Sequence, residues 1–181
     1  MPGYELVGKE ELESIKRIFS EGNNNLYRYN PSRKISLVED FERKFADKIG
    51  VEYAHAVSSG TAAIDIALSA AGIKQGDEVI ITSFTFVAPV ETIFRHGAIP
   101  VPVEIDRSYH FSPEAIEKAI TEKTRAVVAV PMWAPVDYDA VIKICNKHNL
   151  ILIEDSAQCL GGTYKGKHVG TFGTIGSFSF D

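Results

Sequence analysis

The alternation of short apolar runs with helical patterns constrains the fold of this 181-residue chain more than any other feature. From residue 54 onward, six strand-like runs are separated by loops, and four of the intervals have the apolar spacing of a helix. The runs VVAV and ILI are apolar on both faces, as in parallel strands covered on each side. We therefore predict a doubly wound, mainly parallel α/β sheet. The expected strands are 54–57, 78–82, 99–103, 125–130, 150–154 and 177–180, and the expected helices are 62–71, 88–96, 113–120 and 138–148.

The first 34 residues have a different pattern. One helical face, from Leu12 to Phe19, is followed by the polar, turn-rich stretch NNNLYRYNPSR. We predict that residues 1–34 form an N-terminal helix and arm, and that residues 35–181 belong to the α/β domain.

Charge and composition exclude several classes of protein. The formal net charge is −5, so a nucleic-acid partner is not expected, because such binders usually present a basic face. No apolar run approaches the roughly 20 residues of a membrane span, and the N-terminus lacks the apolar stretch of a signal peptide. The two cysteines do not make a disulfide framework, and the five histidines lack metal-ligand spacing. We predict a cytoplasmic protein without a metal site.

Two strand-to-helix loops carry candidate binding residues, since ligands of parallel sheets bind beyond the carboxyl ends of the strands. Ser59, Gly60 and Thr61 precede a helix, whose first N–H groups and partial positive charge suit a phosphate. The alternative is an ordinary helix N-cap in a tight turn. Phe86 follows the next strand and either covers a planar ligand or packs in the core.

A carboxylate follows the apolar strand ILI. A buried Asp155 is costly unless it is paired, and the alternatives are a bound cation, a helix cap or a structural ion pair. Gln158, three residues later, can donate or accept hydrogen bonds, and Ser179 adds a hydroxyl in the last strand-like run. Together these groups suit a flat heteroaromatic ring that carries a phosphate and a basic nitrogen. Pyridoxal 5′-phosphate (PLP) has these parts.

Several long stretches resemble the DegT/DnrJ/EryC1/StrS family of PLP-dependent sugar aminotransferases. They are AVSSGTAAIDIALSAAGIKQGDEVIITSFTFVAPVETIFRHGAIPVPVEID, ILIEDSAQCLGGTYKGKHVGTFG and GSFSF. The resemblance implies the three-layer α/β large domain of fold-type-I PLP enzymes, with residues 35–181 as its N-terminal part. It also implies a homodimer with shared active sites. The reaction it implies is transfer of an amino group from glutamate or glutamine to a nucleotide-linked keto sugar, in amino-sugar and polysaccharide biosynthesis.

The resemblance also implies roles for individual residues. The SSGT turn and Ser179 would contact the phosphate of PLP, Phe86 would stack on its ring, and Asp155 would bind its pyridine nitrogen. Gln158 would lie beside its phenolic oxygen. Three further residues, Tyr27, Arg28 and Trp133, are candidates for substrate contacts, the first two from the arm of a neighbouring subunit or else part of a simple linker.

Two departures from the family pattern limit these expectations. The Schiff-base lysine of the family would lie beyond Asp181, as would the remaining strands and the small C-terminal domain. We therefore expect an N-terminal portion that has no catalytic residue of its own, is inactive alone and associates with itself or with a complementing C-terminal fragment. The loop VPMWAPVDYD faces the site in relatives, which commonly have His and Gly near Pro131 and Trp133, so the family pattern does not fix which substrate contacts Trp133 makes. A PLP-dependent sugar dehydratase, with histidine in place of the lysine, and a non-catalytic regulatory or scaffold protein are the alternatives.

Overall fold

The computed structural model describes residues 7–20 and 37–180, which fall into two compact units that divide between Ala56 and Val57. The first unit contains helices α1 (Lys9–Ser20) and α2 (Leu37–Ile49). The second contains every strand found among the described residues. The predicted boundary at residue 34 and the arm residues Tyr27 and Arg28 lie outside the described residues. No helix in the described part of the chain is long and apolar enough to cross a bilayer.

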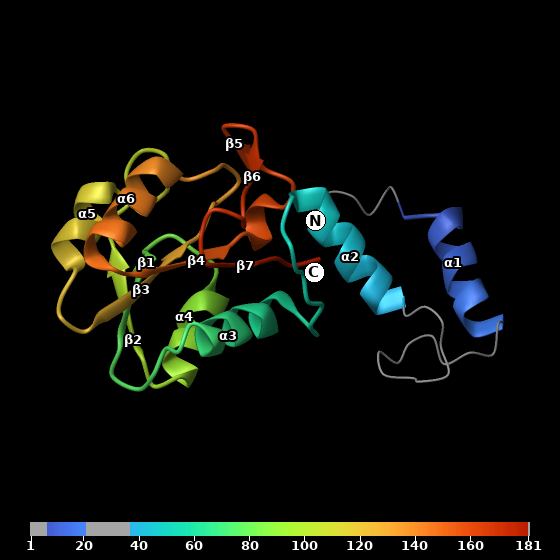
Figure 1. Cartoon of the computed structure of the whole chain (residues 1–181), viewed down its shortest axis with the longest axis horizontal. Helices are drawn as coiled ribbons and strands as arrows, with labels where there is room; N and C mark the ends of the chain where they lie inside the picture. Colours follow the sequence, from blue (N-terminus) through green and yellow to red (C-terminus); the bar gives the residue numbers. More distant parts are fainter. Residues whose placement is uncertain (1–6, 21–36, 181) are drawn as a thin grey trace. The chain divides into compact units, whose positions relative to one another are not determined.

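The second unit is built on a five-stranded, fully parallel sheet with the order β2-β1-β3-β4-β7 (Figure 1). The parallel pairing confirms the predicted fold class. Because all five strands run the same way, their carboxyl ends meet at one edge of the sheet. The strands are β1 (Glu78–Thr82), β2 (Ile99–Val103), β3 (Thr124–Ala129), β4 (Ile151–Asp155) and β7 (Ile175–Ser177).

Helices cover both faces of this sheet (Figure 1). Helices α3 (Gly60–Ala70) and α4 (Val87–Arg95) lie on one face, and α5 (Pro113–Ala119) and α6 (Tyr138–His148) lie on the other. Both helices of the second pair begin at a side-chain N-cap. Ser112 Oγ accepts the Ala115 N–H at 3.1 Å, and Asp137 Oδ1 accepts the Ala140 N–H at 3.2 Å.

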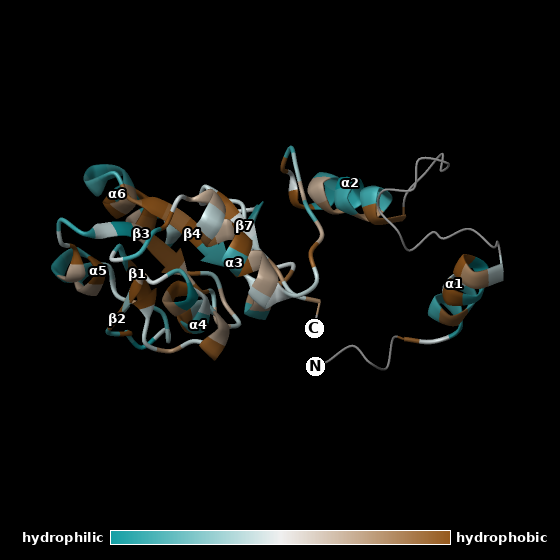
Figure 2. Ribbon diagram, turned by 90° about the horizontal axis from the view of Figure 1, so that it is seen from below, coloured by the Kyte–Doolittle hydropathy of each residue, from teal (hydrophilic) through white to brown (hydrophobic). Residues whose placement is uncertain are grey.

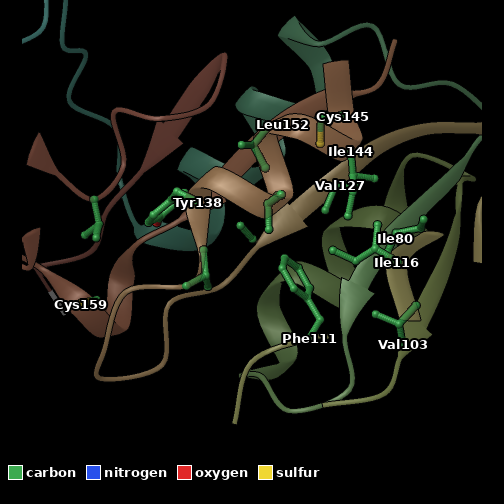
Figure 3. Packing of buried hydrophobic residues seen from close by; sticks show 14 residues of the cluster. Ile80, Val103, Phe111, Ile116, Val127, Tyr138, Ile144, Cys145, Leu152 and Cys159 are labelled. Carbon is green, nitrogen blue, oxygen red and sulfur yellow. The ribbon is translucent and has the colours of Figure 1, made fainter. Parts of the chain in front are cut away.

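The core consists of two apolar clusters separated by the sheet. The hydropathy colouring shows apolar central strands flanked by helices with mixed surfaces (Figure 2). On one face Ile80, Val127 and Leu152 pack with residues of α5 and α6, as Figure 3 shows. On the other face Ile81 and Ile153 pack with residues of α3 and α4. Since side chains alternate along a strand, neighbours in β4 belong to opposite faces.

Two predicted strands are corrected by the structure. Residues 54–57 form no strand, because the Ala56 N–H donates to Glu42 Oε1 at 2.7 Å rather than to a neighbouring strand. The last strand is Ile175–Ser177 and not 177–180. A side chain at Gly176 would collide with the carbonyl oxygen of Gly170, so this strand requires a glycine that the sequence pattern assigned to a loop.

The stretch YKGKHVG forms a β-hairpin. Strand β5 (Thr163–Tyr164) pairs antiparallel with β6 (Lys167–His168). Both residues of the turn, Lys165 and Gly166, have positive φ, as the tight two-residue turns of hairpins require.

Candidate functional site

The N-terminus of α3 lies at the carboxyl edge of the sheet, beside the segment that follows β7. Helix α3 packs against β4 and β7. A Cβ atom built on Gly60 would lie 2.7 Å from Ser179 Cβ, so the helix start and this segment touch closely only because residue 60 is glycine. The structure therefore brings together Gly60 and Ser179, which are 119 positions apart in the printed sequence.

The turn before α3 caps the helix and also leaves N–H groups that suit a phosphate, so it combines both roles considered from the sequence. Ser59 is the N-cap, and its Oγ accepts the Ala62 N–H at 3.1 Å. Capping satisfies that one donor, whereas the N–H groups of Gly60 and Thr61 in the first turn have no partner within the helix. These N–H groups and the helix dipole favour an anion at this end of α3.

Asp155 ends β4 on the same face of the sheet as α3 and is only 4% exposed. The Ala157 N–H donates a hydrogen bond to Asp155 Oδ1 at 3.3 Å. Burial raises the pKa of Asp155 to about 6, and this hydrogen bond lowers the pKa by less. Within the described ranges no Lys, Arg or His forms an ion pair with it, so the structural ion pair considered from the sequence is not found there. The carboxylate suits a cationic group supplied by a ligand.

Glu154, the preceding residue, is also a buried carboxylate, but its oxygens have several hydrogen-bond donors. Glu154 Oε2 accepts the Gly170 N–H at 2.7 Å, and Oε1 accepts the N–H groups of Phe172 and Gly173 at 2.6 Å each. Burial and the nearby Glu154 raise the pKa of Tyr138. Sequence reasoning missed Glu154, and the signal that could have indicated it is a second acidic residue at the end of an apolar strand.

Two buried hydroxyl groups at the same edge were also missed. Thr85 Oγ1 follows β1 and Ser156 Oγ follows β4, and neither atom has a hydrogen-bond partner among the described residues. Buried polar atoms in folded proteins are nearly always paired. Both hydroxyls therefore leave hydrogen-bonding capacity for a ligand or water, and their position directly after strand ends was the available sequence signal.

The remaining predicted residues lie in separate loops of this edge. Phe86 is exposed at the N-cap of α4, which disagrees with the alternative that it packs in the core. Gln158 is exposed in the short 3₁₀ helix η2 (Ala157–Cys159). Trp133 follows β3, is 68% exposed, and has a left-handed backbone with φ of 60°. The edge thus offers an anion site at α3, a carboxylate for a cation at Asp155 and an exposed aromatic ring, which together suit a planar ligand that carries both charges.

Comparison with known proteins gives a consistent result. Residues 16–181 match the model of the DegT/DnrJ/EryC1/StrS aminotransferase family. A GDP-perosamine synthase from Escherichia coli O157:H7 is 43% identical over 151 residues, which cover 82% of this chain and 42% of the relative. The chain therefore spans less than half the length of this relative.

Solved structures agree with the sequence match. An aminotransferase from Psychrobacter cryohalolentis superposes with a TM-score of 0.85 at 35% identity, over 96% of this chain and 43% of the other. A GDP-4-keto-6-deoxymannose-3-dehydratase, solved with a trapped PLP-glutamate geminal diamine, gives a TM-score of 0.81 at 26% identity, over 93% of this chain and 44% of the other.

Proposed function

Because the chain belongs to the DegT/DnrJ/EryC1/StrS aminotransferase family, we propose that it supplies the cofactor-binding part of an enzyme that aminates a nucleotide-linked keto sugar. The family, the fold class and the PLP cofactor expected from the sequence are confirmed. Glutamate or glutamine as amino donor and a homodimeric assembly are parts of the proposal. The GDP-linked product named for the Escherichia coli relative supports a nucleotide-linked substrate.

The observation that carries this proposal is the isolated carboxylate of Asp155. When bound, PLP supplies an electron sink, which depends on a protonated ring nitrogen. Asp155 holds that proton at the ring nitrogen through a charge-assisted hydrogen bond. Burying the ionised Asp155 carboxylate without a cation is unfavourable because the charge loses its hydration. A cationic ring beside it would offset this desolvation cost.

The other residues of the edge fit the rest of the cofactor. The free N–H groups at the start of α3 and the hydroxyls of Ser59 and Ser179 would hold the phosphate. Phe86 would cover one face of the ring, and Gln158 would lie near the phenolic oxygen, as in the family pattern. Thr85 and Ser156 offer two further hydroxyls at the same edge. The residues present therefore fit PLP.

We propose that this chain alone holds PLP without a covalent bond and is inactive. The two lysines that precede the last strand most closely in the sequence lie on the β5–β6 hairpin and have partners there. Lys165 pairs with Asp139, and Lys167 Nζ lies 4.8 Å from the centroid of the Phe172 ring.

Titration with PLP tests this function. PLP should bind with an absorbance change at about 390–430 nm, and Asp155→Asn should weaken binding by about tenfold to a hundredfold, the size of one charge-assisted hydrogen bond. The matched control Asp139→Asn alters an exposed carboxylate and should leave the affinity unchanged. Borohydride treatment should leave the chain mass unchanged. Equal PLP affinity in the wild type and Asp155→Asn would contradict the assignment of Asp155.

A sugar dehydratase is the second candidate, favoured by the similarity to GDP-4-keto-6-deoxymannose-3-dehydratase. That similarity is at 26% identity, below the 43% of the GDP-perosamine synthase, so we favour amination. Once the chain is complemented, the product distinguishes the two, since amination adds nitrogen to the sugar and dehydration removes a hydroxyl. A non-catalytic regulatory or scaffold role predicts no uptake of PLP.

A further inference from the structure

The loops after β1, β2 and β3 bring three aromatic rings together at the carboxyl edge of the sheet. The Phe84 centroid lies 5.9 Å from that of Trp133, with an edge-on angle of 65° between the rings. It lies 5.6 Å from that of Tyr109, with the rings tilted by 46°. Trp133 and Tyr109 are 68% and 57% exposed, whereas Phe84 is half-buried. The cluster therefore presents aromatic surface at the edge where parallel sheets bind ligands.

Both exposed rings stand on an unusual backbone. The φ angles of Trp133 and Tyr109 are 60° and 65°, in the left-handed region that bulky side chains rarely adopt. Such conformations persist only where the surroundings enforce them, and they gather at ligand-binding positions. The fold thus holds two large aromatic residues at positions that would favour glycine.

The turn that carries Tyr109 is fixed by a local network. Asp106 Oδ1 accepts the Ser108 N–H at 2.7 Å and also the Ser108 hydroxyl. Ser108 Oγ lies 3.2 Å from His110 Nδ1, and the Asp106 N–H donates to the His110 carbonyl at 2.9 Å. This network closes the turn from both ends, so Tyr109 is held in place before any ligand arrives.

The Trp133 loop adjoins the same turn through His110. His110 is buried, and burial lowers its pKa. Asp106 and the backbone carbonyls of Met132 and Ala134, which flank Trp133, act in the opposite direction. His110 thus lies beside Tyr109, its neighbour in sequence, and near the backbone that flanks Trp133, and its Nε2 has no hydrogen-bond partner among the described residues.

A cation lies in the same turn. Arg107 is exposed and comes two residues before Tyr109. Across the described ranges it forms no ion pair. Aromatic surface next to an unpaired guanidinium suits a ligand that joins a flat ring to phosphate.

We propose that Phe84, Tyr109 and Trp133 form a stacking platform for the nucleobase of the substrate, with Arg107 placed for its phosphates. This inference rests on the proposed function, in which the sugar is carried by a nucleotide. Every base has a flat π-face, so stacking on Trp133 or Tyr109 would contribute affinity without selecting one base. Trp133 becomes a specificity-determining residue for nucleotide-linked over free sugars.

Trp133 is the single tryptophan of the chain, so its fluorescence reports on the platform directly. GDP should quench this fluorescence with a saturable curve, and guanosine should quench it more weakly. Ribose 5-phosphate, which lacks a base, should leave it unchanged. Quenching by ribose 5-phosphate equal to that by GDP would overturn the proposal, as would failure of GDP to quench.

Substitutions sharpen the test. Tyr109→Ala should weaken GDP binding about tenfold, the size of one aromatic–base contact, and Arg107→Ala should weaken binding of GDP but not of guanosine. Trp133→Phe, measured by calorimetry, should retain more affinity than Trp133→Ala. The control Phe94→Ala removes a comparably exposed ring (63%) from α4 and should change nothing. Unchanged GDP affinity in Tyr109→Ala and Trp133→Ala, with native circular dichroism, would refute the platform.

Failure of this inference is separable from failure of the proposed function. Uptake of PLP, followed by absorbance, without saturable GDP quenching would reject the platform and leave the cofactor assignment intact. GDP quenching without PLP uptake would reject the cofactor assignment and leave an aromatic nucleotide site.

Discussion

Glu154 and Asp155 are adjacent, both are buried, and both end the same strand, yet their surroundings differ completely. Glu154 faces the α5–α6 side and accepts three backbone N–H groups at 2.6–2.7 Å. Asp155 faces the α3 side and accepts a hydrogen bond from one N–H group of the described residues, that of Ala157, at 3.3 Å. The difference shows that the Glu154 carboxylate stabilises the fold through its hydrogen bonds, while the Asp155 carboxylate can still accept hydrogen bonds from a ligand.

The positions of the two partners explain this division. The donors to Glu154 come from residues 170–173, so the carboxylate fixes the loop that leads into β7. Near Asp155 the fold supplies instead the N-terminus of α3 and the segment around Ser179. An anion site and an unpaired carboxylate on one side of a strand match a zwitterionic ligand better than they match a structural role.

The largest effect should come from Glu154→Gln. The amide would place an NH₂ donor against at least one backbone N–H and replace charge-assisted bonds by neutral ones. We expect the free energy of unfolding to fall by about 4 kcal/mol, measured by urea denaturation at pH 8. A loss of stability smaller than that caused by an ordinary surface substitution would contradict the contrast between Glu154 and Asp155. It would mean that Glu154 does not stabilise the loop of residues 170–173.

A smaller effect of opposite sign is expected from Asp155→Asn in the cofactor-free chain. The folded-state pKa of Asp155 is raised to about 6 from an ordinary value of 3.8, so the folded wild type binds the proton more tightly than the unfolded chain. Wild-type stability is therefore lost as the pH rises from about 4 to 6, and the loss is complete above 6. The asparagine variant has no carboxyl group to ionise and does not show this loss. It should therefore be more stable than the wild type by about 3 kcal/mol at pH 8 and equal to it near pH 3.

Denaturant titrations of both proteins at pH 3, 5 and 8 check this expectation. The exposed substitution Asp139→Asn serves as the control and should show no such pH-dependent gain. A gain for Asp155→Asn that is the same at all three values would show that packing, rather than charge burial, distinguishes the two side chains.

The sequence pattern predicts the fold well where local signals agree with tertiary packing. Helices α5 and α6 begin where Ser112 and Asp137 supply caps, and the burial of Asp155 follows from the apolar strand before it. The strand predicted at 54–57 is absent and shows where local patterns are insufficient. The Ala56 N–H donates to Glu42, a residue distant in sequence, instead of to a neighbouring strand.

The site is less predictable than the fold, because its decisive features come from contacts distant in sequence. The donors to Glu154 lie 16–19 residues away. The approach of Ser179 to Gly60 depends on the packing of α3 against β7. The left-handed φ of Trp133 opposes the local preference of tryptophan, so no propensity argument finds it.

Carbon-detected NMR titration of the Asp155 carboxyl, with and without PLP, tests the central claim most directly. The account predicts a pKa of about 6 in the cofactor-free chain and a fall well below that value when the pyridinium is bound. An Asp155 pKa near 3.8 in the free chain, or one that stays at about 6 in the presence of saturating PLP, would contradict it.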